Sequence, residues 1–194
     1  MSVPAFEIIR AAPDGGRRGR LTLAHGVVET PAFMPVATHG SVKGITPAQL
    51  EELGASIVLS NAYHLAQRPG VEVVQALGGV HGLMGWDGPI LTDSGGYQVM
   101  SLAALVQVTD DGVHYRSHVD GRRGLLRPED AIADQEALGV DVAMSLDECV
   151  PAASSLDVVA QAVVRATARA TIAGDDAAGT HSSSDMATST PSAS

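Results

Sequence analysis

The chain has 194 residues, enough for one domain with a sizeable core and too few for two full domains. Its net charge of −10 argues against a general nucleic-acid binder, and its lone cysteine, Cys149, excludes an internal disulfide and a cysteine-based zinc site within this chain. No apolar run is long enough to cross a bilayer and the start lacks a secretory signal pattern, so we expect a cytoplasmic protein without a membrane partner.

Short apolar runs of strand length recur between residues 30 and 151, and each one stops at polar residues. The runs are Ala32–Val36, Ser56–Leu59, Ile90–Leu91 and Val140–Leu146. Continuous apolar runs are typical of strands that are buried on both faces of a parallel sheet. The sequence therefore predicts four parallel strands.

Helix signals separate these strands. Thr46 can cap a helix that ends at Gly54, and two more helices are expected over Pro69–Leu77 and Pro128–Gly139. Residues Leu156–Ile172 also have helical spacing. Strands and helices thus alternate along the chain, which indicates an α/β architecture.

Two further segments stand apart from this alternation. Residues Val106–Leu126 contain turn signals at 110–112 and 120–121, and they predict an antiparallel hairpin inserted between the third and fourth strands. From residue 173 onward the chain has almost nothing to bury. We therefore expect one domain over residues 1–172 and a low-complexity, disordered tail over residues 173–194.

The polar residues that follow the predicted strands include Asn61, Asp93 and Asp147. In α/β barrels the active site lies at the carboxyl ends of the strands, where such residues would meet. A complete barrel needs roughly 250 residues. The sequence therefore predicts a partial barrel with its site at this edge of the sheet.

The stretch Thr92–Gln98 is the most informative in the chain. A strand delivers the carboxylate of Asp93 to the edge of the sheet, and two glycines then allow backbone amides to approach a ligand closely. An aromatic ring and an amide follow at once. A tight turn capped by the aspartate is the simpler alternative, but seven consecutive residues of this kind favour a binding site.

A second carboxylate, Asp147, follows the next strand, within Leu146–Pro151. One carboxylate can accept two hydrogen bonds from guanine, whose N1–H and exocyclic amine are both donors. A strand-end cap is the simpler alternative. Asp93 and Asp147 could also be paired carboxylates for glycoside hydrolysis or metal ligands, and spacing alone does not decide between these chemistries.

These stretches resemble the tRNA-guanine transglycosylase family over about residues 5 to 165, in one order and register. The similar segments are Thr30–Thr38, Ser60–Leu65, Arg68–Gly70, Thr92–Gln98, Leu126–Glu129 and Leu146–Pro151. The resemblance implies a TIM (β/α)8 barrel. It also implies a base-exchange glycosyl transfer, in which the wobble guanine of tRNA is replaced by a 7-deazaguanine on the route to queuosine.

The resemblance further implies roles for single residues. Asp93 would be the general acid/base that handles the ring-nitrogen proton of the base. Tyr97 would stack on the base, and Asp147 would read its guanine-like edge. Asn61 would orient Asp93 or the ribose, and Cys149 would line the pocket rather than bind metal. The residues that would support the pocket are Ser94, Gly95, Gly96 and Gln98.

The chain departs from the family pattern beyond about residue 164. The family's nucleophilic aspartate lies in a Gly-x-Gly-x-Pro-x-Asp setting, and its structural zinc is held by three cysteines and a histidine. Neither pattern occurs in this sequence. We therefore expect no cofactor and no nucleophile in this chain. We interpret it as a truncated transglycosylase or, alternatively, a short paralogue.

The resemblance and the departure together lead to expectations about partners and about function. The resemblance implies tRNA and guanine or a 7-deazaguanine as partners, with a homo-oligomer or a complementing chain in addition. A non-catalytic base-binding remnant or accessory subunit is the alternative to an enzyme.

Overall fold

The computed structural model describes residues 5–102, 104–168 and 170. Its centre is a four-stranded parallel sheet with the order β10–β6–β5–β4. The strands are β4 (Val36–Ala37), β5 (Val58–Ser60), β6 (Ile90–Thr92) and β10 (Val142–Ala143). With the helices that connect its strands, this sheet confirms the α/β class.

Strands β5 and β6 lie close to the apolar runs that predicted them, but β4 and β10 are shorter than predicted. The ladder of β4 starts after Pro35, which has no backbone N–H to donate. Strand β10 ends at Ala143, because the next backbone N–H, that of Met144, donates to the side chain of Gln135 at 2.8 Å instead of to a strand.

The labelled helices of the described residues are α1 (Pro47–Glu52), α2 (Ala62–Gln67), α3 (Val71–Ala76), α4 (Gly79–Met84), α5 (Gly96–Leu102) and α6 (Pro128–Leu138). The capping box of Thr46 and the end of α6 at Gly139 are confirmed. Helix α3 starts later than predicted, because Gly70 has a φ of 110°, outside the helical region. A further helix runs over 156–168, and the predicted continuation to 172 reaches residues outside the described part.

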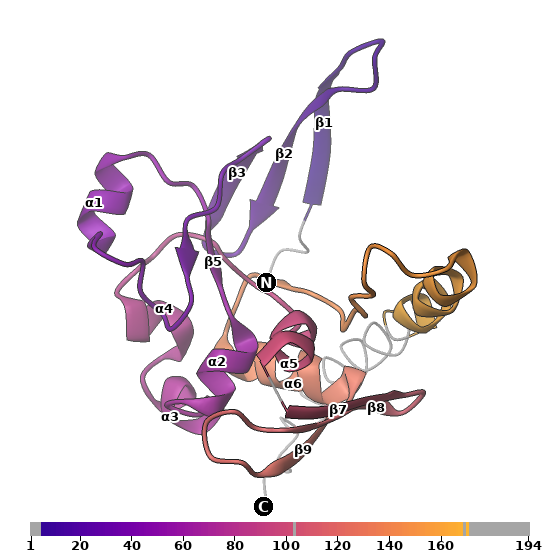
Figure 1. The fold of residues 1–194 in the computed structure, drawn as a ribbon. Helices are drawn as coiled ribbons and strands as arrows, with labels where there is room; N and C mark the ends of the chain where they lie inside the picture. The colour runs from indigo at the N-terminus through magenta and orange to yellow at the C-terminus, as the bar shows by residue number, and fades with distance from the viewer. Residues whose placement is uncertain (1–4, 103, 169, 171–194) are drawn as a thin grey trace, which may run out of the picture.

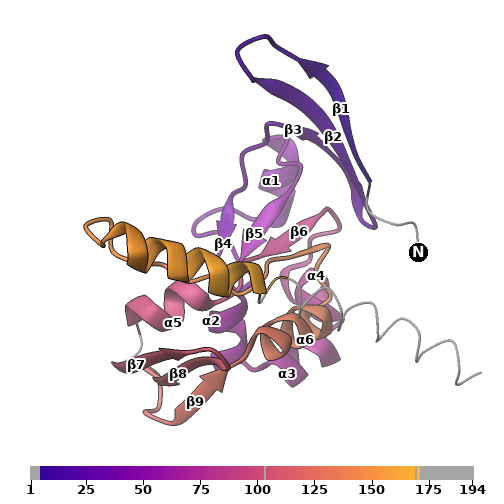
Figure 2. The ribbon, with the colours of Figure 1, turned by 90° about the vertical axis from the view of Figure 1, so that its right-hand side faces the viewer.

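Two antiparallel sheets flank the parallel sheet and lie at opposite ends of the molecule (Figures 1 and 2). The insertion holds three strands, β7 (Ala104–Thr109), β8 (Gly112–Arg116) and β9 (Arg123–Leu126), so both predicted turns exist. The other sheet comprises β1 (Ala5–Ala11), β2 (Arg17–Leu23) and β3 (Gly26–Thr30), and the sequence did not predict it.

The largest buried cluster fills the space between the parallel sheet and helices α1 to α4 and α6. Val58 and Ile90 point into this cluster, whereas Leu59 and Leu91, on the other face of the sheet, are only partly buried. The prediction of strands buried on both faces is therefore met fully on one face only. None of the helices in the described residues is both long and apolar enough to cross a membrane. The predicted tail, residues 173–194, lies outside the described part.

Candidate functional site

The carboxylate of Asp93 lies at the carboxyl end of β6 and accepts hydrogen bonds from three donors. The side-chain amide of Asn61, which follows β5, donates to Oδ2, and the amide of Gln98 from α5 donates to the same oxygen at 2.9 Å. The backbone N–H of Ala62 donates to Oδ1 at 3.1 Å. Two neighbouring strands and α5 thus fix the orientation of this carboxylate.

Burial raises the pKa of Asp93 above its ordinary value, and the hydrogen bonds from Asn61, Ala62 and Gln98 oppose that rise. The folded state therefore holds the proton of Asp93 more tightly than the unfolded chain does. The stability that results is present below the ordinary pKa of an aspartate and is lost as the pH rises through the folded pKa. A raised pKa favours the protonated carboxyl group, which is the form that can donate a proton.

We predict that Gln98→Ala raises the pKa of Asp93 further. The hydrogen bond from Gln98 stabilises the charged form of the carboxyl group, and the variant removes that bond. Carbon-13 NMR of the Asp93 carboxyl group over a pH titration measures this shift. Gln107→Ala, at an exposed glutamine of β7, is the control and should leave the pKa in place. An unchanged or lower pKa in Gln98→Ala would contradict the prediction.

The carboxylate of Asp147 is exposed and is held by two donors. The hydroxyl of Ser94 donates to Oδ1 at 3.0 Å and itself accepts the backbone N–H of Gly96 at 3.2 Å. The thiol of Cys149 lies 3.7 Å from Oδ2 as a donor. Burial and the neighbouring Asp147 raise the pKa of Cys149, so the thiol keeps its proton. Ser94 therefore joins the Asp93 stretch to Asp147.

The two glycines of the motif let the chain pack closely against itself. Gly95 has a φ of 78°, and a Cβ there would lie 3.1 Å from Cβ of Tyr63. A Cβ on Gly96 would lie 2.9 Å from the backbone oxygen of Asp147. Both glycines therefore have a packing role that sequence reasoning did not foresee, and their contact with a ligand stays a prediction.

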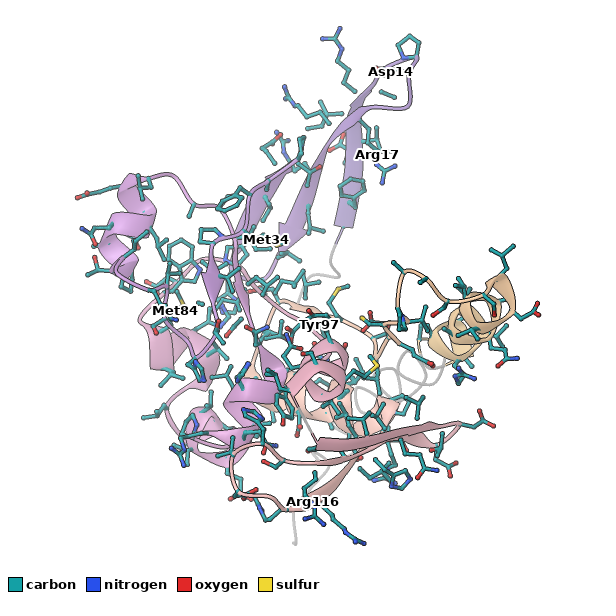
Figure 3. The ribbon with its side chains drawn as sticks, in the orientation of Figure 1. Asp14, Arg17, Met34, Met84, Tyr97 and Arg116 are labelled. Atoms are coloured by element: carbon teal, nitrogen blue, oxygen red, sulfur yellow. The ribbon has the colours of Figure 1, made fainter. Side chains whose placement is uncertain are left out.

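The aromatic ring of Tyr97 is available to a ligand. The residue is 61% exposed on α5, although its ring is a large apolar surface. Figure 3 places it in the central part of the molecule, away from the tip of the N-terminal sheet where Asp14 lies. Stacking of this ring on a base stays a prediction.

The structure also brings three histidines close together, His39, His64 and His118. The rings of His39 and His64 have centroids 4.9 Å apart, and those of His64 and His118 are 6.1 Å apart. His118 Nδ1 lies 3.0 Å from the hydroxyl of Tyr63. Burial, followed by the neighbouring His39 and His118, lowers the pKa of His64. His39 and His64 each follow a predicted strand and were expected at the same edge of the sheet, whereas no sequence pattern linked His118 to them.

The chain matches the family described as "Queuine tRNA-ribosyltransferase" over residues 14–188. It is 56% identical over 147 residues to the queuine tRNA-ribosyltransferase of Desulforudis audaxviator, a match that covers 75% of this chain and 40% of that protein. It is 58% identical over 135 residues to that of Nitrosomonas europaea, covering 70% and 36%. The match to that of Moorella thermoacetica is 52% over 166 residues, covering 85% and 44%.

The chain thus spans about two fifths of the length of the curated relatives it matches. The family match takes in the Asp93 stretch, the Asp147 stretch and the strands that carry them. It agrees with the resemblance of the sequence motifs, and together these observations establish that the chain belongs to the queuine tRNA-ribosyltransferase, or tRNA-guanine transglycosylase, family.

Proposed function

We propose that this chain provides the base-recognition and proton-transfer part of an enzyme that exchanges the wobble guanine of tRNA for a 7-deazaguanine. One observation carries the proposal. A half-buried carboxyl group with a raised pKa, Asp93, and an exposed carboxylate, Asp147, are linked through Ser94 at one edge of the parallel sheet. One group suits proton transfer and the other suits recognition of a base that carries two adjacent donors.

Recognition of guanine needs acceptors that are not already saturated. Each oxygen of Asp147 accepts one hydrogen bond, from Ser94 or from Cys149, and a carboxylate oxygen has lone pairs for two. Asp147 can therefore accept N1–H and the exocyclic amine of guanine while Ser94 and Cys149 hold it in place.

In the proposed reaction a carboxylate attacks ribose C1′ while the glycosidic bond to guanine breaks. Asp93 gives its proton to the ring nitrogen of the departing guanine, and it takes one back from the incoming base as that base displaces the enzyme. The family resemblance places the attacking carboxylate outside the similar segments. The share proposed for this chain is therefore binding and proton transfer.

We also propose that the four parallel strands belong to a (β/α)8 barrel. Their parallel order, their connecting helices and the gathering of polar residues at their carboxyl ends support this architecture. A cytoplasmic location and assembly with a second chain stay predictions.

Equilibrium dialysis with labelled guanine tests the proposal on the full chain. The chain should bind guanine more tightly than hypoxanthine, which lacks the exocyclic amine, and more tightly than adenine. Equal or absent binding of the three bases would overturn the proposed recognition. Incorporation of labelled guanine into tRNA by the same preparation supports the enzyme, whereas binding without incorporation supports the alternative of a non-catalytic base-binding subunit.

A further inference from the structure

Two histidines and an aspartate meet at the end of the parallel sheet that is opposite to Asp93. Asp141 precedes β10 and accepts a hydrogen bond from the N–H of Ile90, the first residue of β6, whereas Asp93 follows the last residue of β6. His25 lies in the turn between β2 and β3, and His81 belongs to α4. One ligand atom from each of the three residues, an imidazole nitrogen or a carboxylate oxygen, lies within 4.8 Å of those of the other two.

The carboxylate of Asp141 is fully buried and fixed by backbone amides. Ile90 N donates to Oδ2 at 2.9 Å, and His25 N donates to Oδ1 at 3.1 Å. His25 Nδ1 lies 2.9 Å from the same Oδ1. Backbone donors of this kind orient a carboxylate that ligates a metal ion without neutralising its charge. A cation beside Asp141 would offset the cost of burying that charge.

His81 supplies a second observation that points to a ligand for this cluster. Its Nε2 is buried and makes no hydrogen bond of normal geometry within the described residues, although it lies 3.3 Å from Asp141 Oδ2. The ring stacks on the ring of His25, with their centroids 3.8 Å apart. The Nε2 atom is thus held in a fixed place beside a carboxylate oxygen.

We infer that His25, His81 and Asp141 form a binding site for a divalent transition-metal ion such as Zn²⁺. Two imidazole nitrogens and one carboxylate oxygen are ligands that zinc takes, with water in the fourth position. Tetrahedral ligands at about 2.0–2.1 Å from zinc lie about 3.4 Å from one another. The separation of 3.3 Å between His81 Nε2 and Asp141 Oδ2 fits that geometry.

The cluster borders on solvent through His25, whose side chain is 43% exposed, and it joins three parts of the fold. A bound ion would connect the N-terminal antiparallel sheet, through His25, with α4 and with the start of β10. Binding should therefore stabilise the folded chain in proportion to the logarithm of ion concentration. This inference is independent of the proposed function.

Titration of the chelator-treated full chain with Co²⁺, a spectroscopic substitute for Zn²⁺, tests the site. We expect one equivalent to bind with visible absorption of tetrahedral Co²⁺, Zn²⁺ to displace it, and Zn²⁺ to raise the melting temperature. His25→Ala should weaken binding by roughly ten-fold or more, since loss of even an outer partner has an effect of that size. Asp141→Asn, which keeps the side-chain shape, should weaken it too.

His114→Ala is the matched control, because it removes an exposed imidazole of β8 outside the cluster. It should bind Co²⁺ as the unaltered chain does. Equal affinity in His25→Ala, with the metal-free melting temperature preserved, would overturn the inference. So would intense near-ultraviolet absorption from thiolate-bound Co²⁺, because that signal would assign the ion to Cys149 instead.

Discussion

Gln135→Leu is expected to lower the free energy of unfolding by about 3 kcal/mol or more, because the change orphans several buried polar groups. Gln135 in α6 is fully buried. Its Oε1 accepts the hydroxyl of Thr92 at 2.9 Å and the backbone N–H of Met144 at 2.8 Å. Its Nε2 donates to the backbone oxygens of Ala131 at 2.8 Å and Met144 at 3.0 Å. Leucine can make none of these bonds.

Urea denaturation followed by the fluorescence of Trp86, which is buried in the main core, measures this loss. Gln75→Leu, at an exposed position of α3, is the matched control and should change stability by about 0.5 kcal/mol or less. Thr92→Val removes one of the four bonds and should have an intermediate effect. A stability for Gln135→Leu within about 1 kcal/mol of the original chain would refute this account.

The sequence predicted the parts of the fold in which local pattern and tertiary packing agree. Helix α6 carries acidic residues in its first turn and Gly139 at its end, so the local signals and the structure coincide. Strands β5 and β6 pass through the core, and the apolar residues that this position requires are the pattern from which the strands were predicted. Asn61 and Asp93 follow these two neighbouring strands, and the parallel pairing of β5 with β6 brings their side chains into contact.

The parts that the sequence did not predict depend on contacts without a local pattern. Every residue of β1 is exposed, so Phe6 and Ile8 follow no burial alternation that would indicate a strand. Asp141 and His25 are 116 residues apart along the chain, yet they are hydrogen-bonded. Only the tertiary structure joins such residues. The part of the candidate site on consecutive strand ends could thus be predicted, whereas the cluster at the opposite end could not.

Asp147→Asn is expected to weaken guanine binding by roughly 100-fold in the full chain, an expectation that rests on the proposed function. The amide keeps the shape of the side chain but loses its charge, and it presents N–H groups to a base edge that carries two donors. A hydrogen bond to a charged group contributes about 1.5–3 kcal/mol, and two such bonds are affected. Asp147 is exposed, so the melting temperature should change little.

Equilibrium dialysis with guanine and hypoxanthine separates loss of recognition from a general loss of the pocket. Hypoxanthine makes one of the two bonds to Asp147, so its weaker binding should fall by a smaller factor than that of guanine. Asp157→Asn makes the same chemical change at an exposed carboxylate of the helix over 156–168 and should leave both affinities in place. If Asp147→Asn reduced both affinities equally, Asp147 would position the pocket rather than recognise the amine, because only direct recognition distinguishes bases that differ by that group.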